Sequence, residues 1–401
     1  MRLIMGCLLL LLIAVASPAD AVFREATSPA GHHSGEPWLY VTPGGVVYLS
    51  WVEAHGDSLH RFLFSTLGAE GWSESRVIAQ GSDWFVNWAD VPSIVATDEG
   101  WLAAHWLKKS GSDTYAYDIK VSQSFDGGRE WSSPVTPHSD GTQTEHGFAS
   151  LLPTADGLML AWLDGRNFAG ESPSESMTVR AGWLGRDGRM SNERALDERT
   201  CDCCPTAIVL TDAGVLVGYR DRSADEIRDI TLVRYAEQKW RKEAWGSQDG
   251  WEIAGCPVNG PAIDASGTAV ALAWFTMAGG KASVYCTLSD DGGATFQGRI
   301  RVDGSDPVGR VDVVATPDGG AVVCWIERTE GAAELRVRAI SPQGALFPPV
   351  VATQISAKRS SGYPRIIRSG TDVMVAWTSI EGAPQVRTAT AGLESLKEVG
   401  R

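Results

Sequence analysis

Positive charge is scarce in this sequence. The chain has 35 Lys and Arg residues against 49 Asp and Glu residues, which gives a formal net charge of −14. No run of basic residues occurs along it. Binding to the phosphate backbone of nucleic acids depends on clustered Lys and Arg, so we expect no nucleic-acid partner. The excess of acidic groups mainly favours solubility.

Long apolar runs are also scarce. The sequence begins MRLIMGCLLLLLIAVASPADAVF, in which one basic residue precedes an apolar run at residues 8–15 and an Ala-x-Ala site that ends at Ala21. This is the pattern of a secretory signal peptide, and the run is too short to span a bilayer. We therefore predict a signal peptide at 1–21 and one exported domain at 22–401. We expect it to be a secreted or periplasmic monomer with no membrane insertion after cleavage.

Helical periodicity is the third scarce feature, and short β-strand patterns take its place. Apolar stretches such as GVVYLSW, GLMLAW and TDVMVAW are followed by segments with alternating apolar and polar residues, such as SVYCTLS. Turns of the Asp-Gly type separate them. Strands of this length joined by Gly and Asp turns indicate an all-β protein.

The apolar stretches recur at a nearly fixed period. Each ends in an aromatic residue, and successive aromatics are 51 to 57 residues apart. They are Trp51, Trp106, Trp162, Tyr219, Trp274, Trp325 and Trp377. Four strands per repeat at this period are typical of the blades of a β-propeller. We predict seven blades, with six as the alternative, and we expect the N-terminal AVFREAT to complete the last blade and close the ring.

Two repeats contain a more specific motif. Residues 124–131 read SFDGGREW and residues 289–296 read SDDGGATF. Both resemble the Asp-box, S-x-D-x-G-x-x-W, of sialidases and related BNR-repeat propellers, with Phe in place of Trp in the second. We expect the Asp to accept hydrogen bonds from turn amides, the Gly to adopt positive φ and the aromatic ring to pack on the blade. The motif residues are Ser124, Asp126, Gly128 and Trp131, and Ser289, Asp291, Gly293 and Phe296.

This resemblance implies an exo-α-sialidase-like glycoside hydrolase that needs no cofactor. Sialidases have an Arg-Ile-Pro motif near the start of the propeller, three arginines that hold the sialate carboxylate, an Asp acid/base and a Tyr–Glu nucleophile pair. The segment SPAGHHSGEPWLY before the first blade has no arginine, and YPRII at 363–367 is the nearest match to Arg-Ile-Pro. The sequence therefore leaves catalytic activity open.

Seven loops are expected to meet at one end of the central channel. Each leads into the first strand of a blade, and we call them the mouth loops. They are residues 32–37, 84–92, 144–149, 201–206, 254–261, 308–313 and 360–365. Polar groups that converge on a rigid frame are typical of binding sites. The mouth loops thus predict a site for a glycan or another small anionic ligand.

Charged residues near these loops supply candidate roles. We expect Asp90 to act as the acid and Tyr363 as a nucleophile or sugar contact, because a Tyr nucleophile is a known exception among glycosidases. Arginine binds carboxylates through two parallel hydrogen bonds. The predicted carboxylate clamp consists of Arg166, Arg220, Arg222 and Arg365, with Glu226 as a partner. The predicted substrate contacts are Trp88, Asn259 and Arg310. The alternative to a carboxylate clamp is that the segment YRDRSADEIRDI is a solvated loop whose charged residues form salt bridges with one another.

The cysteines allow three interpretations. TCDCCPT contains Cys201, Cys203 and Cys204, and Cys256 lies in a neighbouring mouth loop. A disulfide from Cys256 would link blades four and five, as exported proteins permit. Thiolates with His146 or His32 would instead form a metal site that selects copper or zinc. The third interpretation is a redox-active thiol. The rival to a sialidase-like function is therefore a non-catalytic periplasmic propeller with a cysteine-rich metal-binding or partner-binding face.

The remaining cysteines and histidines are expected to be structural. Cys286 and Cys324 lie in apolar strand patterns and are predicted to be core residues. His60 and His105 lie beside apolar residues. His138 follows the first Asp-box on a peripheral strand, so we expect it on the surface.

Overall fold

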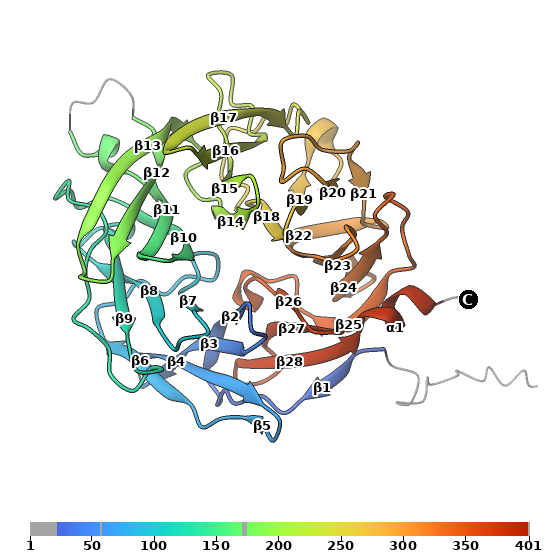
Figure 1. Ribbon diagram of the computed structural model, residues 1–401, viewed down its shortest axis with the longest axis horizontal. Coiled ribbons are helices and arrows are strands. Elements are labelled where there is room, and N and C mark those ends of the chain that lie inside the picture. The colour runs from blue at the N-terminus through green and yellow to red at the C-terminus, as the bar shows by residue number, and fades with distance from the viewer. Residues whose placement is uncertain (1–21, 57, 171–174, 400–401) are drawn as a thin grey trace, which may run out of the picture.

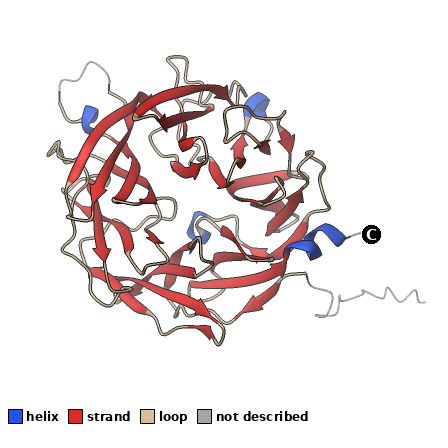
Figure 2. Ribbon diagram, viewed as in Figure 1, coloured by secondary structure: helices blue, strands red, loops and turns tan. Residues whose placement is uncertain are grey.

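Seven β-sheets form a ring in the computed structural model, which describes residues 22–56, 58–170 and 175–399 (Figure 1, Figure 2). Six of these sheets have four or five strands and one has three. The arrangement is a seven-bladed β-propeller, so the predicted fold is confirmed and the six-bladed alternative is wrong. The predicted signal peptide at 1–21 lies outside the described residues. Within the described residues, no helix is long and apolar enough to cross a membrane.

The first strand of each blade lies at the axis. Each of these seven strands contacts the first strands of both neighbouring blades. In blade order from 1 to 7 they are β2 (Ser34–Val41), β7 (Ser93–Ala96), β10 (His146–Thr154), β14 (Ala207–Thr211), β18 (Ala262–Ser266), β22 (Asp306–Ala315) and β26 (Arg365–Ser369). The mouth loops lie directly before these strands or within them, since β2, β10 and β22 include residues 34–37, 146–149 and 308–313, and they therefore gather around the axis.

The second strands hold the repeated aromatics. They are β3 (Val47–His55), β8 (Leu102–Lys109), β11 (Gly157–Asp164), β15 (Gly214–Arg220), β19 (Ala269–Thr276), β23 (Ala321–Thr329) and β27 (Asp372–Ser379). All seven repeated aromatics are at most 5% exposed. The indole N–H of Trp162 donates to Asp164 two residues on, and that of Trp325 donates likewise to Glu327. In these two strands the ring thus fills the core while its N–H is satisfied by an acidic side chain of the same strand.

The outer strands complete the sheets. The third strands are β4 (Leu59–Gly68), β9 (Tyr117–Ser124), β12 (Met177–Gly185), β16 (Ile230–Ala236), β20 (Ser283–Ser289), β24 (Ala332–Ile340) and β28 (Gln385–Gly392). The outermost strands are β5 (Gly71–Trp72) and β6 (Arg76–Gly81), β13 (Met190–Thr200), β17 (Lys239–Gly246), β21 (Ile300–Arg301), β25 (Val350–Ile355) and β1 (Arg24–Ala26). In blade 2 an isolated bridge between Val121 and Val135 takes the outermost position.

Little helical structure interrupts the sheets. The short 3-10 helices are η2 (Arg166–Phe168), η3 (Ala278–Gly280) and η4 (Arg359–Ser361). The one α-helix among the described residues is α1 (Leu393–Glu398), which contacts β28 and β24.

The N-terminal strand closes the ring, as the sequence predicts. β1 pairs antiparallel with β28, with Arg24 opposite Thr390 and Ala26 opposite Thr388. Phe23, directly before β1, is buried in the apolar cluster between blades 6 and 7. The first and last segments of the domain are therefore held together by both main-chain pairing and apolar burial.

The turn in SFDGGREW is held by its own side chains. Asp126 Oδ1 accepts hydrogen bonds from the amides of Arg129 (2.9 Å) and Glu130 (3.0 Å), which hold the pKa of this carboxyl below its usual value. Gly128 has φ of 82°, and a Cβ there would collide with Phe64. The turn in SDDGGATF repeats this pattern. Both motifs lie at the ends of third strands, away from the axis, which suits a structural role.

Burial of Phe23 predicts how the ring closure responds to mutation. Phe23 is 6% exposed, whereas Phe125 is 57% exposed. We expect Phe23→Ala to lower the free energy of unfolding by roughly 3 kcal/mol, because a large apolar side chain leaves the core. Hydrogen exchange in β1 and β28 should rise first. Phe125→Ala is the matched control, and an equal loss of stability in both variants would contradict this account of closure.

Candidate functional site

Apolar side chains from five mouth loops fill the channel mouth. Phe148 and Tyr363 are buried in one apolar cluster with side chains from three further mouth loops. We call this group the apolar plug, and its members are Trp88, Ala89, Phe148, Cys203, Val258 and Tyr363. The predicted polar residues do gather around the axis, but they surround an apolar centre. Any ligand site among them is therefore displaced from the axis.

Tyr363 is part of this plug and not an exposed phenol. Its hydroxyl donates to the carbonyl oxygen of Val258, across the mouth from blade 7 to blade 5. Its ring stacks on Trp88, with centroids 6.1 Å apart. Burial raises the pKa of Tyr363 to about 12. These observations contradict the predicted role as a nucleophile, because the phenol is buried, protonated and already hydrogen-bonded.

Arg220 and Arg310 use their guanidinium groups to hold main-chain carbonyls. Arg220 Nε donates to Asn259 O (2.8 Å), and its two terminal nitrogens donate to two further carbonyls. Arg310 Nη1 donates to Gly362 O (3.0 Å), and its guanidinium carbon is 4.7 Å from the centre of the Trp88 ring. Burial lowers the pKa of both arginines to about 10. We therefore correct their predicted roles in binding substrate: both tie loops together.

Asp90 and Asn259 play equivalent parts in two blades. Asp90 Oδ1 accepts a hydrogen bond from Phe148 N (2.8 Å), and Asn259 Oδ1 accepts one from Arg310 N (2.7 Å). Phe148 and Arg310 both have positive φ, and each follows a glycine at which a Cβ would collide with the accepting side chain. Each Asp or Asn thus fastens one mouth loop to the next. This role replaces the predicted substrate contact of Asn259 and the exposed acid expected of Asp90, which is 1% exposed.

Asp90 is also one end of a buried hydrogen-bonded array. The Tyr117 hydroxyl is 3.1 Å from Asp90 Oδ2 and 2.8 Å from Glu145 Oε1. Because this hydroxyl has one hydrogen, it satisfies both carboxyl groups only when one of them is protonated. Burial, outweighing the Tyr117 hydrogen bond, raises the pKa of each carboxyl to about 7. Glu145, in the mouth loop of blade 3, is the half-buried end of the array.

A cluster of three arginines surrounds Glu226 on blade 4. Glu226 Oε1 accepts from Arg222 (2.8 Å) and Arg199 (3.3 Å), and Oε2 accepts from Arg228 (2.9 Å). We call these four residues the arginine cluster. The hydrogen bonds from Arg222, with those from Arg228, lower the pKa of Glu226 to about 2. The predicted pairing of Arg222 with Glu226 is present, and Arg220 is not part of it.

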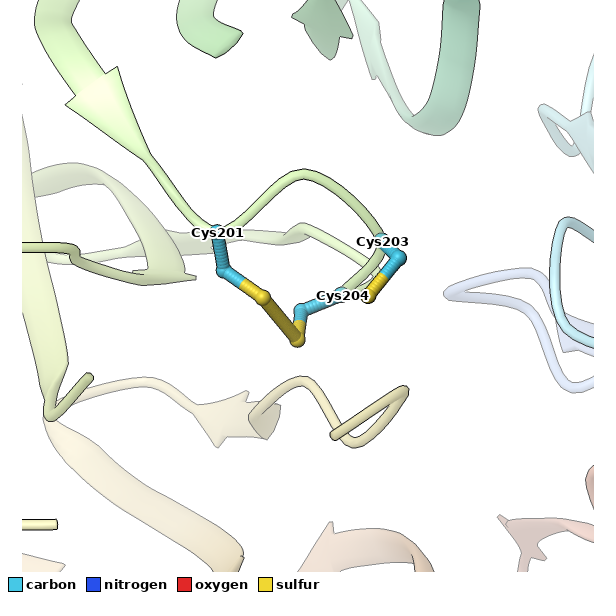
Figure 3. A group of neighbouring side chains, drawn as sticks. All are labelled: Cys201, Cys203 and Cys204. Atoms are coloured by element: carbon cyan, nitrogen blue, oxygen red, sulfur yellow. A yellow bond between two sulfur atoms is a disulfide. The ribbon is translucent and has the colours of Figure 1, made fainter. Parts of the chain in front are cut away.

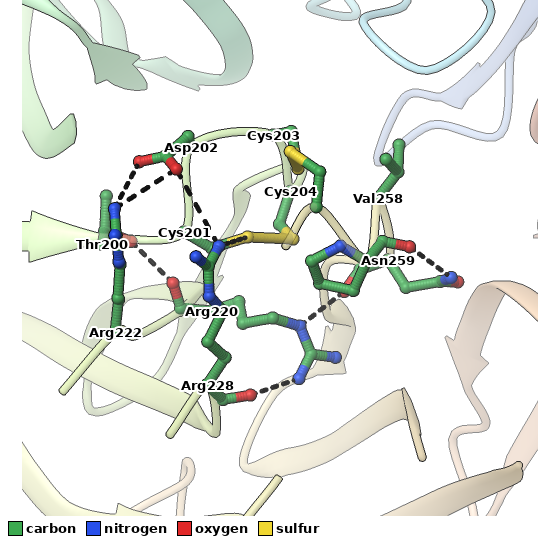
Figure 4. The surroundings of a disulfide bond; sticks show 12 residues. Thr200, Cys201, Asp202, Cys203, Cys204, Arg220, Arg222, Arg228, Val258 and Asn259 are labelled. Carbon is green, nitrogen blue, oxygen red and sulfur yellow. Dashed lines mark hydrogen bonds and ion pairs between the residues drawn. A yellow bond between two sulfur atoms is a disulfide. The ribbon is translucent and has the colours of Figure 1, made fainter. Parts of the chain in front are cut away.

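The arginine cluster is joined to the cysteine loop through Asp202. Arg222 Nη1 lies 3.3 Å from both carboxylate oxygens of Asp202, and Arg228 Nη1 lies 3.9 Å from Oδ2 and 3.5 Å from Cys201 Sγ (Figure 4). The Asp202 carboxylate also contributes to the raised pKa of Glu145. Asp202 therefore interacts electrostatically with both the arginine cluster and Glu145.

All four mouth-loop cysteines form disulfides. Cys201 pairs with Cys204 within one loop (Figure 3), and Cys203 pairs with Cys256, 53 residues away. The Cα–Cα separations are 5.9 and 6.0 Å. The second bond links blades 4 and 5, as the disulfide interpretation predicts. Paired sulfurs are not thiolate ligands, so the structure contradicts the predicted thiolate metal site. The free cysteines of the described chain, Cys286 and Cys324, are buried as expected.

Arg166, His146 and His138 lie together between blades 2 and 3. Arg166 Nε donates to Asp164 Oδ1 (2.7 Å), and Nη2 donates to Glu193 (2.7 Å). His146 stacks on His138 with ring centres 3.7 Å apart, and none of its described polar contacts is with a cysteine. The expectation that His138 lies on the surface is wrong, because the long loop after β9 folds it inward.

Arg365 lies on the other side of the axis from the arginine cluster. It begins β26 in blade 7, and its guanidinium carbon is 4.3 Å from the centre of the Trp38 ring. Burial lowers its pKa, against the attraction of Asp312. The structure therefore does not bring Arg365 together with Arg222 in one clamp.

Sequence reasoning missed Tyr117, Glu145 and Arg199. Glu145 is in the mouth loop TEHGFA, so its position alone was a usable signal. Tyr117 begins a third strand and Arg199 is the second-to-last residue of an outermost strand, and no motif marks either residue.

Comparison with known proteins shows the fold alone. Neither a protein-family model nor a curated protein sequence matches the chain. The polysaccharide lyase Uly1 is similar over 95% of this chain and 94% of its own, with 11% identity and a TM-score of 0.53. Trypanosoma rangeli sialidase in complex with DANA is similar over 82% of this chain, with 13% identity and a TM-score of 0.48. An ulvan lyase is similar over 80% of this chain and 81% of its own, with 14% identity and a TM-score of 0.46. The chain spans 56% to 57% of the first two matched sialidase chains.

The burial of Asp90 predicts a dependence of stability on pH. Its pKa of about 7 exceeds the value of about 3.9 in an unfolded chain. The folded protein therefore binds more protons than the unfolded chain between about pH 4 and pH 7, and the free energy of unfolding falls as pH rises through this window. Asp90→Asn keeps the acceptor for Phe148 N, as Asn259 does for Arg310, and removes the ionisation. We expect this variant to lose less stability between pH 5 and pH 8 than the unmodified protein.

Urea unfolding at the two pH values would measure this effect. The difference between the proteins should reach a few kcal/mol at most, since one pKa unit corresponds to about 1.4 kcal/mol. Asp225→Asn, at an exposed position, is the control and should leave the pH dependence unchanged. Equal losses in the Asp90 variant and the unmodified protein would show that Asp90 does not titrate in this window.

The Cys203–Cys256 bond predicts a local loss of stability on its removal. The double variant Cys203→Ser, Cys256→Ser opens a loop of 53 residues, which costs roughly 4 kcal/mol in the chain-entropy model. Blades contact mainly their neighbours, so hydrogen exchange should rise in residues 201–206 and 254–261 first. Cys286→Ser, in the core of blade 5, is the control and should not open these loops selectively. Unchanged protection of both loops in the double variant would refute a structural role for the bond.

Proposed function

We propose that the protein binds a glycan that has a carboxylate group, and cleaves it, at a site between the arginine cluster and Glu145. Such a ligand is sialic-acid-like in charge. The arginine cluster would hold its carboxylate. Glu145 would donate a proton to the glycosidic oxygen as that C–O bond breaks, while a water molecule bonds to the anomeric carbon and releases a proton to the solvent, from which Glu145 is reprotonated. This proposed function is the sialidase-like hydrolysis that the Asp-box resemblance suggests, but it is assigned to other residues than those predicted from the sequence.

The convergence of three arginines on one carboxylate is the observation that carries the proposal. Arg199, Arg222 and Arg228 come from two chain segments and all reach Glu226. The three guanidinium groups carry three positive charges, whereas the carboxylates of Glu226 and Asp202 carry two negative charges, so one positive charge is in excess. Arg222 and Arg199 are also partly exposed. Guanidinium groups bind any carboxylate in the same planar geometry. The three arginines that hold the Glu226 carboxylate are therefore also suited to hold the carboxylate of a ligand.

Glu145 has the properties of a proton donor at neutral pH. Its pKa of about 7 keeps a large fraction protonated, whereas an ordinary Glu is ionised. Tyr117 fixes its orientation through a 2.8 Å hydrogen bond. The propeller fold that the chain shares with the polysaccharide lyase Uly1 over nearly its whole length also supports a role in glycan processing.

The alternative is a non-catalytic propeller whose cysteine-rich face binds a partner. Cys256 is exposed, so the Cys203–Cys256 bond is at the surface of the mouth. This reading keeps the arginine cluster as a binding feature and assigns no proton transfer to Glu145.

Turnover and binding assays with two probes test the proposal. We expect the protein to bind or cleave a fluorogenic sialoside or a polyuronate. Glu145→Gln should lower kcat by about 100-fold or more, because the proton donor is lost. The rate should also fall as pH rises above about 7, where Glu145 is ionised. Arg222→Ala should weaken binding by roughly 10- to 100-fold, and Arg189→Ala, which removes a fully solvated guanidinium group, should not.

Removal of the Glu226 carboxylate is expected to change the binding affinity in the opposite direction to Arg222→Ala. Glu226→Gln frees the three arginines and should tighten binding of the carboxylated probe. Weaker binding would mean that Glu226 itself contacts the ligand or only orders the loop. Binding without turnover would favour the non-catalytic alternative, and the absence of both binding and turnover would refute the proposed function.

A further inference from the structure

Five side chains of metal-binding type gather between blades 2 and 3, apart from the cysteine loop. They come from four chain segments: β9, the loop at residues 125–145, β10 and β11. They are Asp118, His138, Asp140, His146 and Asp164. Their donor atoms fall into two groups, and in each group all donor atoms lie within 4.8 Å of one another. His146 belongs to both groups.

The hydrogen bonds of His146 define which of its nitrogens is free. Nδ1 is 3.2 Å from the carbonyl oxygen of Thr144, and because a carbonyl only accepts, Nδ1 carries a hydrogen. Nε2 is buried without a hydrogen-bond partner, and it faces Asp140 Oδ2 at 3.2 Å and Asp164 Oδ1 at 3.7 Å. In the neutral ring this nitrogen would point a lone pair at two carboxylate oxygens. Such an arrangement is repulsive unless Nε2 itself carries a proton or a cation lies between them, and Arg166, which is 3.3 Å from Asp140 Oδ2 and 2.7 Å from Asp164 Oδ1, offsets part of the carboxylate charge.

The separations match those of metal ligands. Metal bonds of 2.0–2.1 Å in a tetrahedral site place neighbouring ligand atoms about 3.4 Å apart. The two observed separations from His146 Nε2, 3.2 and 3.7 Å, lie on either side of this value. Since both acids and the imidazole are buried, the group is also shielded from competing water.

The surrounding hydrogen bonds support the same assignment. A metal-binding His usually donates its other N–H to a carbonyl, and metal-binding carboxylates are themselves hydrogen-bonded. The Nδ1 contact of His146 with Thr144 meets the first condition. Arg166 donates to both oxygens of Asp164, and the amide of Thr142 donates to Asp140 Oδ1. His138 Nδ1 lies 3.2 Å from Asp140 Oδ2 and orients that carboxylate.

We propose that Asp140, His146 and Asp164 bind a divalent transition-metal ion. One imidazole with two carboxylates is a donor set of mixed type, which suits Zn²⁺ and not a thiophilic ion such as Cu(I). The ion would join the long loop before blade 3 to β10 and β11. This proposed metal site involves neither the cysteines nor the residues of the proposed function.

Metal analysis of the full chain tests the proposal. The protein is purified with its disulfides intact and without a polyhistidine tag, stripped with a chelator and titrated with Zn²⁺ by calorimetry. We expect about one equivalent of Zn²⁺ to bind and to raise Tm. His146→Ala and Asp140→Asn should each lose at least 10-fold in affinity. His55→Ala is the matched control, because His55 also lies beside one carboxylate, that of Glu53, but at the surface.

Two outcomes would overturn the proposal. Failure of the unmodified protein to take up Zn²⁺ would mean that a proton on His146 Nε2 separates the carboxylates. Uptake that persists in folded His146→Ala, or that is lost equally in His55→Ala, would place the metal elsewhere. Circular dichroism on each variant confirms folding before titration, and Asp140→Asn decides the result if the His146 variant does not fold.

Discussion

Buried polar side chains that satisfy main-chain groups of a neighbouring blade hold the channel mouth together. Asp90 and Asn259 accept amide hydrogens of the next mouth loop, while Arg220 and Arg310 donate to carbonyls. Phe148 and Arg310 lie where the strand register of β10 and β22 shifts, so their amides have no partner in the sheet and would cost free energy if buried alone. Because these side chains supply the missing partners, the loops can converge at the axis and bury the apolar plug. The rest of the mouth depends on this condition.

The plug also decides where chemistry is located. Since the axis is filled by apolar side chains, the polar groups with exposed edges lie over blades 3 and 4. Glu145 reaches this region from the buried array, and the arginine cluster reaches it from the loop after β15. Asp202 is ion-paired with Arg222 and lies in a loop that two disulfides restrain. The cysteines thus contribute to the site by fixing the position of a charged loop, and this role requires no metal.

The fold could be predicted from the sequence because the repeat period reflects how each blade packs against the next. Each repeated aromatic must fill the same space between blades, so Trp162 and Trp325 recur at matching places in their strands. The closing strand was predictable for a similar reason, since blade 7 lacked its outermost strand. For the cysteines, the blade assignment predicted only that a disulfide from Cys256 would link blades 4 and 5, and left its partner and two other interpretations open. In the first two cases one residue type has one structural use at one position of the repeat.

The site was less predictable because charged residues near a channel have two uses that sequence does not separate. Arg220 and Arg222 are two residues apart, yet Arg220 is the buried last residue of β15, whereas Arg222 lies in the loop beyond the strand and is partly exposed. Tyr363 has the residue type expected of a nucleophile, but its hydroxyl is used by Val258. Conversely, Tyr117 and Glu145 are 28 residues apart and meet through an isolated β-bridge that no sequence motif marks. Residue type determines what a side chain can do, and the burial of its polar atoms determines which of these roles remain available. Because the polar residues at the axis are buried and already hydrogen-bonded, the candidate catalytic residues lie at the boundary between blades 3 and 4.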